Sequence, residues 1–277
     1  MQQITIRDAL QQSSRDIDDI DARILLQHVL DVSHAHLIAH AEQALDSKQV
    51  QSFRLLMERR ARGEPVAYLT GKQEFYSLVF TVTPAVLIPR PETELLVDLA
   101  LGQIPLDLPW KILDLGTGSG AIALAIAKHR PLADIVAVDF SADALAVAKT
   151  NASELGVNNV RFIEADWIGD FNGERFNLIV SNPPYIAPGD PHLAQGDLRF
   201  EPHVALAAEG EGLKCIRSII AAAPAHLTTG GALLLEHGYD QAGACGRLLS
   251  EAGFVRVFSR PDLAGILRVS GGALETA

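Results

Sequence analysis

The chain has 277 residues, of which 48% are hydrophobic and 21% are charged, and this composition suits one large or two smaller globular domains. A formal net charge of −11 argues against a protein that seeks duplex DNA through its phosphates, because such proteins usually carry a basic face. The two cysteines lie far apart and form no metal or redox pair. With no apolar run of about 20 residues and no signal-like N-terminus, the sequence predicts a cytoplasmic protein without membrane or metal.

The N-terminal part of the chain predicts a small helical bundle. Between residues 4 and 62, apolar residues such as Ile20, Ile24 and Leu25 recur at helical spacing, and no segment looks like a strand. We therefore expect residues 1–65 to form an all-α domain of about four or five helices.

The pattern changes after this bundle. Tyr76 to Val82 alternates and is rich in β-branched and aromatic residues, as strands are, and Ala67 to Leu69 offers a preceding partner. We expect a β-hairpin linker over residues 66–92. The segment Leu87-Ile-Pro-Arg-Pro-Glu then leads into a helix near Thr93.

From Trp110 onward, strands and helices alternate, which predicts an α/β domain with a doubly wound parallel sheet over residues 93–277. The seven expected strands are Lys111–Leu115, Ile135–Asp139, Val160–Ile163, Phe176–Val180, Ala232–Glu236, Val255–Phe258 and Gly265–Val269. The expected helices are Ala121–His129, Ala142–Leu155, Leu213–His226 and Gln241–Ala252. No helix separates the last two strands, so we expect an antiparallel edge at the C-terminus.

A glycine-rich loop stands where the first strand meets its helix. Its residues are Gly116, Thr117, Gly118, Ser119 and Gly120. Such a loop turns tightly and lets a ligand approach the backbone, and its spacing fits a dinucleotide as well as S-adenosylmethionine. The preceding Asp114 favours S-adenosylmethionine, because that ligand is cationic whereas a phosphate would be repelled.

Two further positions suit a nucleoside. Asp139 ends the second strand about 20 residues beyond the glycines, where a carboxylate can accept both ribose hydroxyls. The alternative for Asp139 is a helix cap with Ser141, and both can hold. Asp166 follows the third strand and can accept from an adenine amine, while the Trp167 indole either covers the ring or packs in the core.

Asn182, Pro183, Pro184 and Tyr185 follow the fourth strand, at the edge where open α/β sheets bind ligands. One interpretation is a rigid turn with a packed tyrosine. The other is a clamp for a planar –NH2 group that is to be methylated. The asparagine oxygen accepts one N–H, and a backbone carbonyl held still by proline accepts the other. The tyrosine ring stacks on the planar group, and positioning replaces a strong general base.

These motifs and several longer stretches carry a resemblance. The stretches are Gly63–Gly71 (GEPVAYLTG), Leu87–Glu94 (LIPRPETE), Arg199–Pro202 (RFEP) and Leu235–Gly238 (LEHG). Over essentially its whole length, the chain resembles the PrmC (HemK) family of release factor glutamine methyltransferases, which are class I S-adenosylmethionine-dependent methyltransferases. The resemblance implies methylation of the glutamine side-chain amide in the Gly-Gly-Gln motif of class I peptide chain release factors. We also expect a monomer and, from the acidic charge balance, no nucleic-acid partner.

The same resemblance assigns roles to residues. Cofactor contacts are implied for Gly116, Thr117, Gly118, Ser119, Gly120, Asp139, Trp167 and Asn182. The catalytic and substrate-binding residues are implied to be Asn182, Pro183, Pro184 and Tyr185. Arg90 and Thr93 are expected to close over the cofactor, and Glu201 to meet the substrate. The N-terminal bundle is expected to grip the release factor away from the reacting loop.

Three other functions stay open at this point. An adenine-specific nucleic-acid methyltransferase would share the loop chemistry, but it would need a basic recognition region and a way to extrude the base. A dinucleotide-dependent oxidoreductase would share the glycine loop. A non-catalytic module that binds release factors would share the fold alone.

Overall fold

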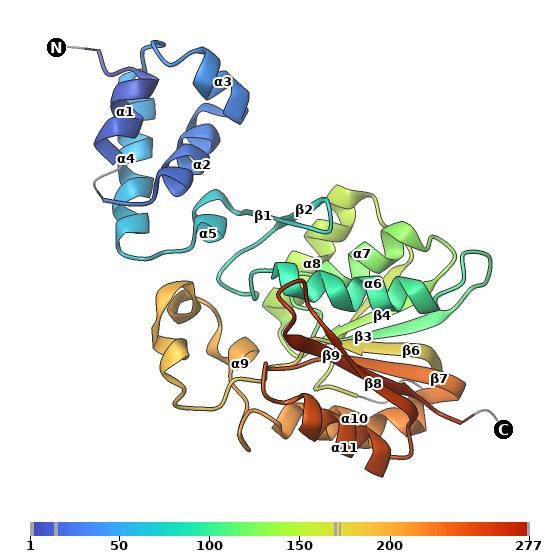
Figure 1. Ribbon diagram of the computed structural model, residues 1–277. Helices are drawn as coiled ribbons and strands as arrows, with labels where there is room; N and C mark the ends of the chain where they lie inside the picture. Colours follow the sequence, from blue (N-terminus) through green and yellow to red (C-terminus); the bar gives the residue numbers. More distant parts are fainter. Residues whose placement is uncertain (1–2, 14–15, 169–170, 172, 276–277) are drawn as a thin grey trace. The chain divides into compact units, whose positions relative to one another are not determined.

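The computed structural model describes residues 3–13, 16–168, 171 and 173–275, and it divides into two compact units, Met1–Lys72 and Gln73–Ala277 (Figure 1). The helices described in the first unit are α1 (Ile6–Ser13), α2 (Asp19–Leu30), α3 (His34–Ala39), α4 (Ser47–Ala61) and α5 (Val66–Thr70). Ile6, Leu25, Leu26 and Phe53 pack together in the core of this bundle. The helical character predicted for this part of the chain is therefore confirmed.

Side chains at the helix starts explain where these helices begin. The carboxylate of Asp18 and the hydroxyl of Ser33 each accept a hydrogen bond from a backbone N–H in the first turn of α2 and α3. At the start of α4, Asp46 and Gln49 form a reciprocal capping box. Each capping residue lies directly before the helix that it caps, so these boundaries depend on the local sequence.

The segment Ala67–Leu69 is helical, so its prediction as a strand was wrong. Pro65 immediately precedes α5, and Gly71 ends it with a left-handed φ of 70°. The hairpin itself follows, with β1 (Lys72–Phe75) and β2 (Leu78–Thr81). Tyr76 and Ser77 form its turn with φ values of 53° and 59°, the conformation that fits the twist of paired strands.

The second unit contains a seven-stranded sheet, as predicted, and its strands lie in the order β5-β4-β3-β6-β7-β9-β8. Its strands are β3 (Lys111–Leu115), β4 (Asp134–Asp139), β5 (Val160–Glu164), β6 (Phe176–Ser181), β7 (Leu227–Glu236), β8 (Val255–Pro261) and β9 (Leu267–Ala273). The first five pair in parallel, and β9 joins β7 and β8 in antiparallel pairs. The expected antiparallel edge is thus present.

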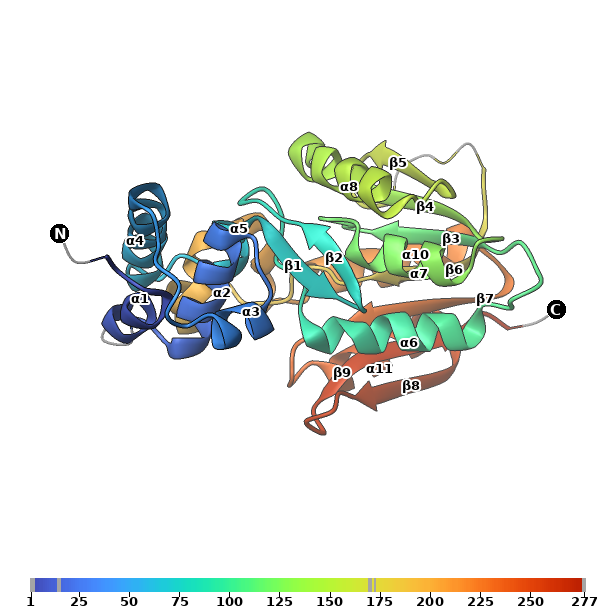
Figure 2. The same ribbon diagram turned by 90° about the horizontal axis from the view of Figure 1, so that it is seen from above.

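Helices cover both faces of this sheet (Figures 1 and 2). The main ones are α6 (Glu94–Gln103), α7 (Ala121–His129), α8 (Ala142–Leu155), α10 (Lys214–His226) and α11 (Ala242–Glu251). The shorter ones are η1 (Pro91–Thr93), η2 (Pro191–Ala194), η3 (Gly196–Phe200) and α9 (His203–Leu206). In β3, Ile112 packs in the cluster with α6, α7 and α8, while Leu113 and Leu115 pack in the cluster with α10 and α11. This alternation buries the strand on both faces.

The strand order positions the candidate site. The chain runs from β3 to β4 and β5 on one side, and it returns to β6 on the other side of β3. The loops after β3, β4 and β6 therefore leave neighbouring strands at the same edge, where the strand order reverses. Open α/β sheets bind their ligands at this switch point.

Candidate active site

The glycine-rich loop after β3 is held against the next strand. The backbone N–H groups of Gly116 and Thr117 donate to the carbonyl of Val138 at 2.9 and 2.8 Å. Gly116, Gly118 and Gly120 have φ values of 72°, 55° and 83°, which side chains with a Cβ rarely adopt. The glycines therefore meet a conformational need of this turn.

Asp139 ties the loop to the end of β4. Its Oδ2 accepts from the Gly118 N–H at 2.8 Å, and its Oδ1 accepts from the Ser141 N–H at 3.0 Å. Ser141 in turn caps α8, because its hydroxyl accepts from the Ala144 N–H at 3.2 Å. Each carboxylate oxygen has a further lone pair. The helix-start role of Asp139 and acceptance of a ribose diol are therefore compatible.

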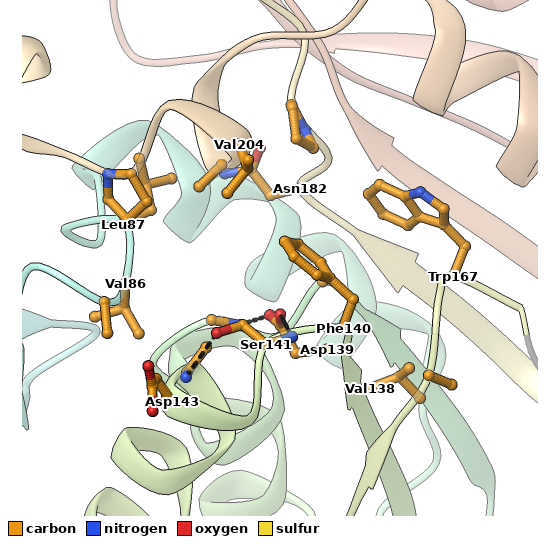
Figure 3. A pocket seen from close by; sticks show the side chains of 18 residues that line it. Val86, Leu87, Val138, Asp139, Phe140, Ser141, Asp143, Trp167, Asn182 and Val204 are labelled. Atoms are coloured by element: carbon orange, nitrogen blue, oxygen red, sulfur yellow. Dashed lines mark hydrogen bonds between the residues drawn. The ribbon is translucent and has the colours of Figure 1, made fainter.

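A cavity of about 280 Å³ opens beside this loop (Figure 3). Val86 and Leu87 lie on the side opposite Trp167 in this view, and Asp139 lies at its base. The residues that line it are Ala85, Val86, Leu87, Gly116, Gly118, Val138, Asp139, Phe140, Ser141, Asp143, Ala144, Ala165, Trp167, Asn182, Pro184, Pro202, Val204 and Ala205. Its charged lining residues are both acidic, and these described walls contribute no lysine, arginine or histidine. Such a cavity suits a cationic ligand better than a pyrophosphate.

The loop residues divide between the wall of this cavity and the layer beneath it. Gly116 and Gly118 line the cavity, whereas Thr117 and Ser119 are buried and Gly120 is the N-cap residue directly before α7. The Trp167 ring lies across from Gly116, where an added Cβ would meet it at 3.5 Å. Trp167 itself thus forms part of the wall.

Asp166, which the sequence offered as an adenine contact, and Asp114, which favoured a cationic ligand, both lie outside the lining of this cavity. Asp166 is exposed and is not among the residues lining the cavity, in contrast to its neighbours Ala165 and Trp167. Asp114 is fully buried beneath the loop, and its Oδ2 accepts from the Thr117 hydroxyl at 2.7 Å. The acidic lining residues of the cavity are therefore Asp139 and Asp143, and Asp114 supports the loop from beneath through Thr117.

A second cavity, of about 320 Å³, adjoins the Asn-Pro-Pro-Tyr segment. It is lined by Leu87, Arg90, Glu92, Asn182, Pro183, Pro184, Tyr185, Ile186, Leu198, Ala205, Leu206, Glu236 and Arg268. Four residues line both cavities, namely Leu87, Asn182, Pro184 and Ala205. The Asn182–Tyr185 segment thus lies between the two cavities: Asn182 and Pro184 line both, and Pro183 and Tyr185 line the second.

Contacts from several elements hold this segment still. The Tyr185 carbonyl accepts from Gln241 Nε2 at 3.0 Å, and a Cβ added to Gly212 would lie 2.1 Å from the same carbonyl oxygen. The Asn182 Nδ2 donates to Thr93 Oγ1 at 3.1 Å. The Tyr185 hydroxyl donates to Glu236 Oε1 at 3.2 Å, and burial raises the pKa of Tyr185. The tyrosine therefore stays neutral at physiological pH.

Arg90, Thr93 and Glu201, which were expected near the cofactor or the substrate, make two separate sets of contacts. The Arg90 guanidinium pairs with the buried carboxylate of Glu201, which also accepts from the Ile88 N–H at 3.1 Å. Arg90 lines the second cavity rather than the first. Thr93 is buried and reaches Asn182 rather than the first cavity. Arg90 and Glu201 thus brace the segment that carries Leu87.

Among the wall residues that sequence reasoning missed, three are Phe140, Leu87 and Glu236. Phe140 follows Asp139 directly and is 54% exposed, so its ring is available to a flat ligand. Leu87 and Glu236 belong to stretches that carried the resemblance, yet they were given no role. The local sequence offered one indication of Phe140, namely that an aromatic residue directly follows Asp139 at the end of β4.

Other kinds of site find no support in the described part of the chain. No three or more histidine, cysteine, aspartate and glutamate side chains gather there as a metal site would need. Among the helices of those residues, none has the length and apolar character required to cross a membrane. The acidic and mixed cavities at the sheet edge are therefore the sites to explain.

The second unit has the fold of known methyltransferases. A family model called methyltransferase small domain matches residues 93–197. A methyltransferase from Pyrococcus furiosus superposes with a TM-score of 0.56 at 18% identity, covering 79% of this chain and 99% of that one. A 16S rRNA methyltransferase from T. thermophilus, solved in complex with AdoMet and guanosine, superposes with a TM-score of 0.54 at 19% identity, covering 74% and 50%. At such identities these likenesses establish the fold.

Closer relatives establish the family. A model called PrmC N-terminal domain matches residues 4–71. A release factor glutamine methyltransferase from Burkholderia pseudomallei is 53% identical over 264 residues, which cover 93% of each chain. One from Escherichia coli is 46% identical over 252 residues, which cover 91% of each. The chain belongs to the release factor glutamine methyltransferase family, and the resemblance read from the sequence is confirmed.

The buried Asp114 gives a prediction for stability against pH. Burial raises its pKa from 3.8 to about 7, although the hydrogen bond from Thr117 acts in the opposite direction and lowers the pKa. The folded state therefore binds this proton more tightly than the unfolded state, and Asp114 lowers the free energy of unfolding as pH rises from about 4 to about 7. In Asp114→Asn this decline should be smaller, as urea unfolding at a series of pH values would measure. An identical decline in both proteins would contradict this.

Proposed function

We propose that this protein transfers a methyl group from S-adenosylmethionine to the side-chain amide nitrogen of the glutamine in the Gly-Gly-Gln motif of class I peptide chain release factors. The observation that carries the proposal is the wall shared by the two cavities, in which Asn182 and Pro184 face both. A transfer between two ligands needs them on either side of such a wall, in contact through a small opening. The proposal places the cofactor in the first cavity and the glutamine in the second.

The first cavity fits S-adenosylmethionine by the chemistry of its donor set. Asp139 has lone pairs left for a ribose diol, and Phe140 and Trp167 offer aromatic faces. The backbone of Gly116 and Gly118 permits close approach, and the remaining loop residues, Thr117, Ser119 and Gly120, support that backbone. When bound, S-adenosylmethionine supplies the methyl group and carries the positive charge that the acidic walls favour.

The second cavity suits the acceptor amide. The Oδ1 of Asn182 accepts one N–H of the glutamine –NH2 group, and a carbonyl of the Pro183-Pro184 segment accepts the other. Tyr185 stacks on the amide plane and fixes its tilt. Two acceptors on one nitrogen draw its lone pair out of conjugation and toward the methyl carbon. As the N–C bond forms, the methyl carbon's bond to sulfur breaks and leaves a neutral thioether. The methylated nitrogen is then cationic and strongly acidic, so it loses its extra proton to water and this chain needs no strong general base. These four residues are the proposed catalytic and substrate-binding residues.

In this proposal each part of the chain has its own role. Residues 1–65 bind the release factor away from the reacting loop, residues 66–92 form the linker and residues 93–277 form the catalytic domain. The mixture of Arg90, Arg268, Glu92 and Glu236 around the second cavity suits a peptide better than a run of phosphates. The protein acts as a cytoplasmic monomer and binds no nucleic acid.

Incubation with cofactor labelled in its methyl group tests the proposal against its alternatives. Label should enter a class I release factor and leave duplex DNA unlabelled. Label in DNA alone would favour an adenine methyltransferase instead. In a thermal shift assay, S-adenosylhomocysteine should raise the melting temperature and NAD should not. Stabilisation by NAD alone would favour an oxidoreductase.

A further inference from the structure

A buried asparagine on α8 has no role in the function proposed above, and it is not among the residues that line the two cavities. Asn151 is 0% exposed. Its Oδ1 accepts from the Thr81 N–H at 2.7 Å, while its Nδ2 donates to the Thr81 carbonyl at 3.0 Å and to the Ser119 carbonyl at 2.8 Å. An asparagine amide has two protons, so both are bound by backbone carbonyls. These partners also fix the orientation of the amide, because a carbonyl cannot donate and an N–H cannot accept.

The backbone groups that Asn151 binds lead to two different walls of the first cavity. Thr81 is the last residue of β2, and the chain continues from it into a wall segment, Ala85–Leu87, whose three residues line the cavity (Figure 3). Ser119 directly follows Gly118, which lines the same cavity from the glycine-rich loop. One amide on α8 therefore connects the chain that leads into the wall segment with the loop.

The chain between Thr81 and the wall segment is stiff. The Val86 N–H donates to the Thr83 carbonyl at 3.1 Å, and the Ala85 N–H donates to the Thr83 hydroxyl oxygen at 3.3 Å. Pro84, whose ring fixes φ, lies within this turn. The position of Thr81 therefore sets the position of the wall segment.

The glycine-rich loop is also packed tightly against α8. A Cβ added to Gly120 would lie 3.3 Å from the Cβ of Ala148, which precedes Asn151 by about one turn of the helix. With the Ser119 carbonyl bound to Asn151, the loop has two adjacent contacts with one face of α8. Helix α8 is thus a common support for both walls, and the Asn151 amide binds the chain of each.

We propose that Asn151 is a positioning residue for cofactor binding, because its amide holds the wall segment and the glycine-rich loop at the separation that the ligand of the first cavity requires. Only the identity of that ligand, S-adenosylmethionine, rests on the proposed function. The far end of the wall segment is held separately, since Glu201 accepts from the Ile88 N–H at 3.1 Å. If the two walls move independently, a ligand that contacts both must also bring them into place, and its apparent affinity falls.

Asn151→Leu tests this role, because leucine has a similar shape and makes none of the three hydrogen bonds. The Kd for S-adenosylhomocysteine, measured by calorimetry, should rise about 5- to 50-fold, since fewer molecules have both walls in place. The KM for S-adenosylmethionine should rise with it. At saturating cofactor, kcat and the KM for the release factor should stay within about threefold of wild type. Unchanged affinity in a folded Asn151→Leu protein would overturn the proposal.

Asn159→Leu is the matched control. The Asn159 Nδ2 also donates to two backbone carbonyls, those of Arg130 and Ala133, at 3.2 and 3.0 Å. These groups precede β4 and β5, at the edge of the sheet opposite the first cavity. Asn159→Leu should lower the melting temperature and bind S-adenosylhomocysteine like the wild type. Equal losses of affinity in Asn151→Leu and Asn159→Leu would show a general effect of stability and overturn the positioning role.

Hydrogen exchange in the wild type gives a second test that does not depend on a variant. The Thr81 N–H exchanges when its bond to Asn151 opens, and Thr81 does not line the first cavity. Saturating S-adenosylhomocysteine should nevertheless slow this exchange, because the ligand favours the state in which both walls are in place. The Asp134 N–H, which donates to the Trp110 carbonyl at the opposite edge, should exchange at an unchanged rate.

The outcomes separate this inference from the proposed function. Unchanged exchange of the Thr81 N–H, in protein that calorimetry shows to be saturated with S-adenosylhomocysteine, would overturn the role of Asn151. A folded wild type that does not bind S-adenosylhomocysteine would instead overturn the proposed function, to which this cofactor is essential.

Discussion

Replacing Asn182 by alanine is expected to lower kcat for release factor methylation at least ~100-fold, the effect of removing one preorganised polar contact to the reacting group. The Asn182 amide donates to Thr93, and Asn182 lines both cavities. In the proposed function its oxygen therefore lies where the methyl group passes to the acceptor amide. The affinity for S-adenosylhomocysteine, measured by calorimetry, should change less than about fivefold. A loss confined to kcat indicates an interaction made in the transition state.

Asn158→Ala is the matched control for this experiment. Asn158 is exposed and lies in the loop before β5, so its replacement should leave both kcat and cofactor affinity unchanged. If Asn182→Ala retained wild-type kcat, the assignment of this residue to the reaction would fail. Activity in neither wild type nor variant would instead favour the alternative of a non-catalytic module that binds release factors.

Replacing Asp139 by alanine is expected to raise the Kd for S-adenosylhomocysteine about 10- to 100-fold, the loss for a pair of hydrogen bonds to a charged acceptor. Both carboxylate oxygens also accept backbone N–H groups, from Gly118 and Ser141, so the variant loosens the glycine loop as well. At saturating cofactor, kcat should fall much less than in Asn182→Ala. Calorimetry and initial rates measure the two effects separately.

Asp134→Ala serves as the control for Asp139. Asp134 is the first residue of β4 and Asp139 is the last, so the two acids lie at opposite ends of the same strand. Asp134→Ala should bind S-adenosylhomocysteine like the wild type. Unchanged affinity in Asp139→Ala would refute the ribose assignment, and equal losses in both variants would indicate a general effect on the strand.

Much of the fold follows from local sequence patterns. The strands of the sheet are short apolar runs flanked by turns, and the order of strands and helices predicts that parallel strands end at one edge. This is why the Gly116–Gly120 loop and the Asn182–Tyr185 segment could be expected to come together. The helix Val66–Thr70 was missed because its apolar residues suggested a strand, although Pro65 and Gly71 are typical helix boundaries.

The failures at the candidate site have a common physical cause. The position of Asp114 before the glycines favoured a cationic ligand but did not show that the fold buries this acid beneath the loop, where it accepts from the Thr117 hydroxyl. Glu236 gave no local signal, because its hydrogen-bond partner Tyr185 lies far from it in the sequence. Burial and hydrogen bonding between distant residues depend on the assembled fold. Periodicity and motif spacing carry no information about them.

The mass of the release factor peptide that contains Gly-Gly-Gln, measured before and after incubation with the protein and S-adenosylmethionine, tests the proposed function most directly. The proposal predicts that this peptide gains the mass of one methylene group, that fragmentation places it on the glutamine side chain, and that Asn182→Ala abolishes the gain. An unchanged peptide mass with active wild-type protein, or a methyl group on any other residue, would contradict it.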